Sequence, residues 1–92
     1  MTTAEIKEWL SNEYREFYCR MHGYSPDDLT HMIVVCDTFS WEDYPVFVTR
    51  DQDVREVEAE YDDVNMQRIM EVYSLSMDIE KQLAEKRAFH YD

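Results

Sequence analysis

The fold depends on two apolar stretches, Met-Ile-Val-Val-Cys at residues 32–36 and Tyr-Pro-Val-Phe-Val at residues 44–48. They are the segments richest in β-branched and aromatic residues, so we expect strands at about 31–37 and 44–49. The first stretch is apolar throughout rather than alternating, which indicates burial on both faces or a central place in the sheet. Pro45 has no N–H to donate, so the second strand should be an edge strand or begin at that proline.

The residues before these strands have the pattern of one long helix. Thr2 and Glu5 have the spacing of a capping box, in which each side chain binds a free backbone N–H. Apolar residues then recur every three or four positions on one stripe, and Gly23 suits the left-handed position that ends many helices. We therefore expect a helix over residues 3–22, followed by a helical turn at 25–28, where a serine precedes a proline and two acids.

The second half of the chain allows more than one interpretation. Residues 55–61 fit either a helix or a third strand, and we favour the helix because glutamate and alanine are poor strand residues. The apolar residues between 66 and 73 also have helical spacing, which predicts another helix there. A last helix should begin with Ser76 as its N-cap.

The predicted fold is α+β, in a single domain over residues 1–92. A short antiparallel β-sheet of two or three strands should pack against an N-terminal helix and two or three C-terminal helices. Two strands alone are only marginally stable. The sheet must therefore rest on its helices, gain a third strand from residues 55–61, or borrow one from a second subunit.

The charge balance restricts the partners. The chain has 21 acidic and 9 basic residues and a net charge of −12. Such a chain repels phosphates, so we expect neither direct nucleic-acid binding nor binding to anionic membranes, and we expect a basic protein surface as partner. There is no signal-peptide pattern and no apolar run of the roughly 20 residues that a membrane span needs. The expected location is cytoplasmic, with reduced cysteines.

The candidate catalytic and metal-binding groups are weak. Cys36, His31 and Asp37 have the residue types of a thiol nucleophile with its base, but His31 and Cys36 should point to opposite faces of a strand. Cys19 and His22 form half of a metal site, and no second pair has matching spacing. We therefore expect no enzyme activity, no metal and no cofactor.

Two segments are candidate partner-binding surfaces. The first is an acidic run whose members are Asp51, Asp53, Glu56, Glu58, Glu60, Asp62 and Asp63. If the run is helical, four of them, at positions 53, 56, 60 and 63, share one edge, which suits a basic groove or merely a solvated face. The second is the stretch 39–44, with Trp41, Glu42 and Asp43, which interleaves aromatic anchors with acids. Trp41 could instead cap the core.

In its size, net charge and acidic run, the chain resembles the small acidic inhibitors of phages and mobile elements, the anti-CRISPR and anti-restriction proteins. The resemblance implies a single domain without a catalytic site, and some of these inhibitors occupy the nucleic-acid groove of their target by mimicking its charge. The expected function is therefore a non-catalytic inhibitor that covers a basic nucleic-acid-binding surface of a host complex. The alternative is a small structural or assembly protein that pairs with itself through the sheet edge or the C-terminal helices, so both a monomer and a homodimer are considered.

Overall fold

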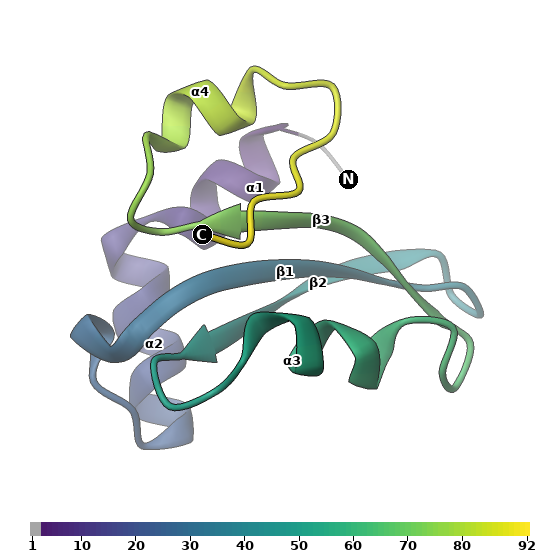
Figure 1. Cartoon of the computed structure of the whole chain (residues 1–92), viewed down its shortest axis with the longest axis horizontal. Coiled ribbons are helices and arrows are strands. Elements are labelled where there is room, and N and C mark those ends of the chain that lie inside the picture. Colours follow the sequence, from purple (N-terminus) through teal and green to yellow (C-terminus); the bar gives the residue numbers. More distant parts are fainter. Residues whose placement is uncertain (1–2) are drawn as a thin grey trace.

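The computed structural model describes residues 3–92 as a three-stranded antiparallel sheet with helices on both faces (Figure 1). This is the expected α+β class. Thr2 of the expected capping box lies outside the described residues. In chain order the elements are α1 (Thr3–Leu10), α2 (Asn12–His22), the 3₁₀ turn η1 (Pro26–Asp28), β1 (Leu29–Asp37), β2 (Glu42–Thr49), α3 (Val54–Tyr61), β3 (Gln67–Ser74) and α4 (Ile79–Leu83).

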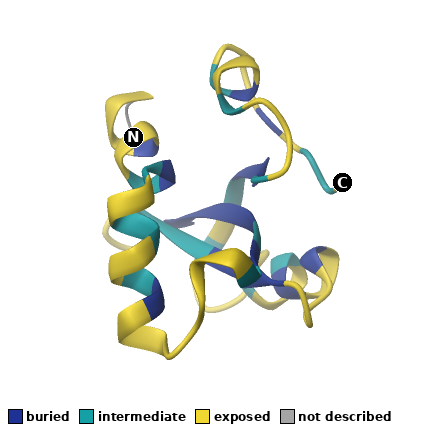
Figure 2. Cartoon of the chain, turned by 90° about the vertical axis from the view of Figure 1, so that its left-hand side faces the viewer, coloured by how far each residue is buried: buried dark blue, intermediate teal, exposed yellow. Residues whose placement is uncertain are grey.

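The strand β1 lies at the centre of the sheet, and both of its faces are buried. The strand order is β2-β1-β3, and residues 32–35 are fully shielded from solvent. Met32 and Val34 pack with α1, α2 and α4, whereas Ile33 and Val35 pack with α3. Figure 2 shows α1 and α2 on one side of the sheet, α3 on the other and α4 above it. The central position predicted from the apolar run is confirmed, and so is the edge position of the strand with Pro45.

The third strand comes from residues 67–74, where we expected a helix, and residues 55–61 form the favoured helix α3. The helical spacing in 66–73 has a different cause. The pairing of β3 with β1 shifts by one residue opposite Val34 and Val35, which leaves Met70 in a β-bulge. Across the bulge, Ile69 and Val72 reach one core cluster while Met70 and Tyr73 reach the other. A bulged strand therefore produced the three-residue spacing of a helix.

The expected helix over residues 3–22 is wrong in one respect, because it divides at Ser11. The Ser11 hydroxyl donates to the Glu8 carbonyl oxygen at 2.6 Å and accepts from the Tyr14 N–H at 3.2 Å, so it both ends α1 and caps α2. The apolar stripe continues across the break, which is why periodicity missed it. Gly23 ends α2 with φ 74°, as expected.

The outer edge of β3 is closed at its C-terminal end, at Val72 and Ser74, by the C-terminal part of the chain. The side-chain amide of Gln82 accepts from the Ser74 N–H and donates to the Ser74 carbonyl oxygen, both at 2.8 Å. Two residues earlier, Val72 makes the same pair of backbone bonds with Ala88 and His90 at 2.9 and 3.0 Å. The helix that carries Gln82 begins after Asp78, which accepts from the Lys81 N–H, and not after Ser76 as expected.

Gln82 should therefore be one of the most sensitive positions in the fold. Replacing it with leucine keeps the apolar volume but leaves both backbone groups of Ser74 without partners, so we expect a loss of about 2–4 kcal/mol in the free energy of unfolding. Urea denaturation measures this loss. The exposed Glu80 on the same helix provides the control Glu80→Leu, and equal midpoints for the two variants would contradict the structural role of the amide.

Candidate interaction surface

Two loops meet at one end of the sheet, on the right in Figure 1. Residues 38–41 join β1 to β2, and residues 62–66 join α3 to β3. The backbone N–H and the hydroxyl of Thr38 both donate to the Met66 carbonyl oxygen, at 2.7 and 2.6 Å. These contacts hold the two loops together, and they bring the predicted Trp41 segment beside the end of the predicted acidic run.

The two loops expose apolar side chains among carboxylates, and we call this region the tip surface. Its apolar members are Phe39, Trp41, Val64 and Met66, which are 78%, 71%, 40% and 59% exposed. Its exposed acids are Glu42, Asp62 and Asp63. Sequence reasoning included Trp41 and the acids but missed Val64 and Met66, because Met66 had been assigned to the buried stripe of a helix.

The backbone of the tip surface is strained. Within the described residues, the non-glycine residues with positive φ are Trp41 (58°), Asp63 (57°), Asn65 (52°) and Met66 (62°), and all four lie in these loops. Asparagine and aspartate tolerate the left-handed region, whereas a tryptophan or methionine there costs about 1–2 kcal/mol. Since Trp41 and Met66 are exposed, burial of their side chains does not offset much of that cost.

Of the other predicted acids, some bond to neighbouring groups and support the fold, and the rest are exposed on or near α3. Three support the fold: Asp51 accepts from the Thr49 hydroxyl, Asp53 accepts from the Arg55 N–H at 2.8 Å as the N-cap of α3, and Glu58 accepts from the Tyr91 hydroxyl at 2.6 Å. Asp43 is also engaged, because its carboxylate lies against the Cys36 thiol.

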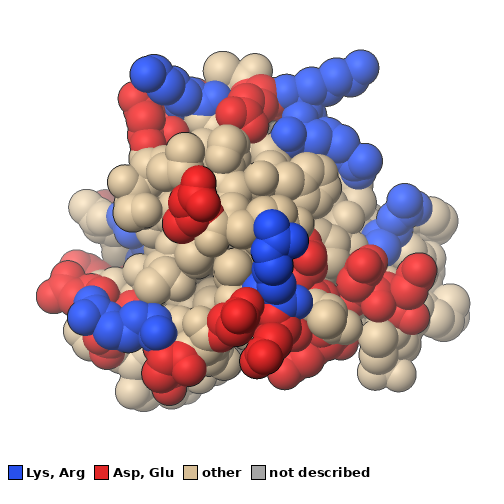
Figure 3. Space-filling view, viewed as in Figure 1, with Lys and Arg blue, Asp and Glu red and all other residues tan. Residues whose placement is uncertain are grey.

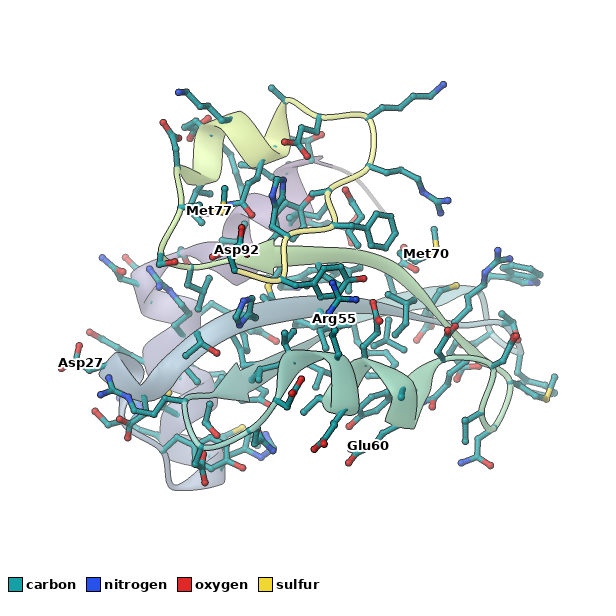
Figure 4. All side chains as sticks on the ribbon, in the orientation of Figure 1. Asp27, Arg55, Glu60, Met70, Met77 and Asp92 are labelled. Carbon is teal, nitrogen blue, oxygen red and sulfur yellow. The ribbon has the colours of Figure 1, made fainter. Side chains whose placement is uncertain are left out.

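The expected row of four acids along one helix edge is shorter in the structure. Asp53 lies before the first turn of α3 and Asp63 lies beyond its end at Tyr61, so Glu56 and Glu60 are the two members within the helix. Figure 4 shows Glu60 pointing away from the sheet. No other side chain in residues 3–92 forms a hydrogen bond or ion pair with the carboxylates of Glu56, Glu60, Asp62 or Asp63.

The two arginines beside the acidic run are directed elsewhere. Arg50 pairs with Asp28 at 3.3 Å, and the Arg55 guanidinium lies 4.0 Å from the centre of the Tyr91 ring (Figure 4). In Figure 3 the acids gather along the lower part of this face, around α3, while basic side chains gather at the top over α4. The charge of α3 and the adjoining tip surface is therefore only partly neutralised from within.

The Cys-His-Asp grouping of β1 is spread along the strand. His31 pairs with Val48 and Ser74, and its ring nitrogens lie 2.9 Å from the Thr30 hydroxyl and 3.0 Å from the Asp92 backbone oxygen. Cys36 is buried at the other end of the strand. Its burial and then the neighbouring Asp43 raise the pKa of its thiol, which disfavours the nucleophilic thiolate.

Within residues 3–92, no group of three or more His, Cys, Asp or Glu side chains is placed to hold a metal ion. None of the helices in this part of the chain is both long and apolar enough to span a membrane. Comparison with protein-family models, with curated proteins and with solved structures found no match.

Trp41 allows a test of whether the tip surface serves stability. Because Trp41 is exposed and has positive φ, Trp41→Gly should raise the free energy of unfolding by up to about 1 kcal/mol. Phe39 is equally exposed but has no positive φ, so Phe39→Gly should lower it by about 0.5–1 kcal/mol. Thermal and urea unfolding give both values, and a destabilised Trp41→Gly protein would show that the tryptophan supports the fold.

Because Tyr91 is hydrogen-bonded to Glu58, we expect the protein to lose stability at high pH. Burial, followed by the hydrogen bond to Glu58, raises the pKa of Tyr91 from 10.0 to about 12. Between these values the folded state keeps a proton that the unfolded chain has released, so stability decreases as the pH rises through this window. In urea midpoints measured against pH, Tyr91→Phe should remove this part of the decrease. The exposed Tyr24 provides the control, and a Tyr24→Phe protein that flattens the profile equally would contradict the assignment.

Proposed function

We propose that this protein is a non-catalytic inhibitor that binds a basic, nucleic-acid-binding surface of another protein. The observation that carries the proposal is that the exposed acids of α3 adjoin the exposed apolar side chains of the tip surface. The exposed acids Glu56 and Glu60 of α3, which have no partner among the described side chains, lead directly into Asp62 and Asp63 of the tip surface, where aromatic and aliphatic side chains are exposed beside them.

This combination has the composition of a binding interface. Apolar and aromatic anchors supply affinity when they are desolvated, and a charged rim supplies orientation and specificity. A net charge of −12 also accelerates encounter with a basic partner and repels nucleic acid, so the protein would compete with nucleic acid for the partner and would not join it. Some small acidic anti-CRISPR and anti-restriction proteins inhibit their targets by such competition, and we propose the same mode of action.

The alternative function is self-association in an assembly through the sheet edge or the C-terminal helices, and its first route needs a free sheet edge. The edge of β3 is occupied at Val72 and Ser74 by Gln82, Ala88 and His90, so pairing with a second copy would fall mainly to β2. Pro45 interrupts the donors of that strand, and the Tyr18 hydroxyl reaches the backbone of Phe47 on it. Both features make the β2 edge a poorer site for pairing, so we favour binding to a different protein.

Charge reversal tests the proposal. The double variant Glu56→Lys and Glu60→Lys should reduce capture of the partner from host cytosol at low salt by roughly tenfold or more, because it places two positive charges in a basic interface. Excess nucleic acid should release the partner from the wild-type protein, and high salt should weaken capture. Identification of the captured protein by mass spectrometry then shows whether it binds nucleic acid.

The matched control is the pair Glu13→Lys and Glu16→Lys on α2. It changes the net charge from −12 to −8 just as the test pair does, because each reversal adds two charges, and it likewise alters one first-turn residue of a helix. The control should retain capture. Equal losses in both pairs would indicate a nonspecific charge effect. A stable dimer in sedimentation that is indifferent to salt would favour self-association.

A further inference from the structure

We propose that the tip surface selects arginine over lysine in its basic partner, with a guanidinium group stacked on Trp41 or Phe39 and bonded to the neighbouring carboxylates. The inference rests on the proposed function for its biological meaning, but it concerns the chemistry of one surface and is tested separately. It assigns the partner as a protein segment that presents arginine side chains.

The side chains needed for such recognition are exposed together. Phe39 and Trp41 present most of their surface to solvent, and Glu42 follows Trp41 directly in the chain. Asp62 and Asp63 line an open hollow of about 430 Å³ between the loops, together with Thr38 and Met66. The region thus exposes aromatic faces on one loop and carboxylates on the loop that is hydrogen-bonded to it.

The charges at this end of the molecule favour a cation. Arg68 is the one basic side chain that lines the hollow within the described part of the chain, and the two carboxylates of Asp62 and Asp63 line it as well. The aromatic loop is also fixed before any partner arrives. The Asp37 carboxylate accepts from the Phe39 N–H at 2.9 Å, and the Asp37 carbonyl oxygen accepts from the Trp41 N–H at 2.7 Å. Preorganised anchors lose less entropy on binding.

Arginine fits this surface better than lysine. A guanidinium is planar, so it can stack on a ring while its N–H groups bind a carboxylate in a forked geometry. A lysine ammonium is a compact and strongly hydrated charge that does neither as well. The chain already places one guanidinium over an aromatic ring, because the Arg55 guanidinium lies 4.0 Å from the centre of the Tyr91 ring.

The test compares oligo-arginine and oligo-lysine peptides of equal length and charge, with affinities measured by calorimetry. The wild-type protein should bind the arginine peptide roughly two- to fivefold more tightly. The double variant Phe39→Leu and Trp41→Leu keeps the apolar bulk but removes the rings, so it should bind both peptides equally. Trp41→Tyr alone, which retains a ring, should keep a preference. In a Trp9→Phe background, Trp41 is the sole tryptophan, and the arginine peptide should change its fluorescence.

Three results would contradict the arginine preference. Equal affinities for the two peptides, or a preference that survives the double leucine variant, would overturn the inference. Ring-dependent self-association in sedimentation would overturn it as well, by assigning the tip surface to a second copy of the chain. The Glu56→Lys and Glu60→Lys protein should bind both peptides more weakly while keeping their ratio. If the ratio holds but that protein still captures its cellular partner, the proposed function fails and the arginine preference stands.

Discussion

The structure depends on the burial of β1 on both of its faces. Because Met32 and Val34 point to one face while Ile33 and Val35 point to the other, each face of the sheet must be covered by its own layer. The helices α1 and α2 supply one layer and α3 supplies the other. A sheet of three strands is near the lower limit of stability in water, so these two layers are what allow a chain of 92 residues to fold around it.

The same constraint explains how the C-terminal part of the chain is used. A central strand needs a neighbour on each side, and the outer neighbour β3 then exposes its own edge. Gln82 and residues 88–90 close the C-terminal end of that edge, while the buried Glu71 carboxylate accepts from the Ala88 N–H and the Tyr73 hydroxyl, both at 3.0 Å. Whereas α4 and the C-terminal segment are occupied in this way, α3 and the tip surface present exposed acids at the other side of the fold from that edge contact.

The sequence predicted the parts of this fold whose signals are local. The apolar run of β1, the proline of β2 and the glycine after α2 each act through their own chemistry, and each was interpreted correctly. The strand β3 was missed because a bulge at Met70 imitates helical spacing, and pairing with β1 overrides that pattern. The candidate site was predicted as two separate segments. Their meeting depends on Thr38 binding the Met66 carbonyl oxygen, a contact between residues 28 positions apart that no pattern could indicate.

The tip surface violates three local preferences at once. Trp41 and Met66 have backbone angles that suit glycine, their side chains are exposed, and carboxylates stand beside them without a compensating cation in sufficient number. An acidic surface that serves solubility alone requires neither exposed aromatic rings nor a tryptophan in the left-handed backbone conformation. Natural sequences tolerate such local conflicts mainly where function requires them. A partner that covers the rings and supplies positive charge would resolve two of the three conflicts together. This is the physical reason for regarding the tip surface as a binding site.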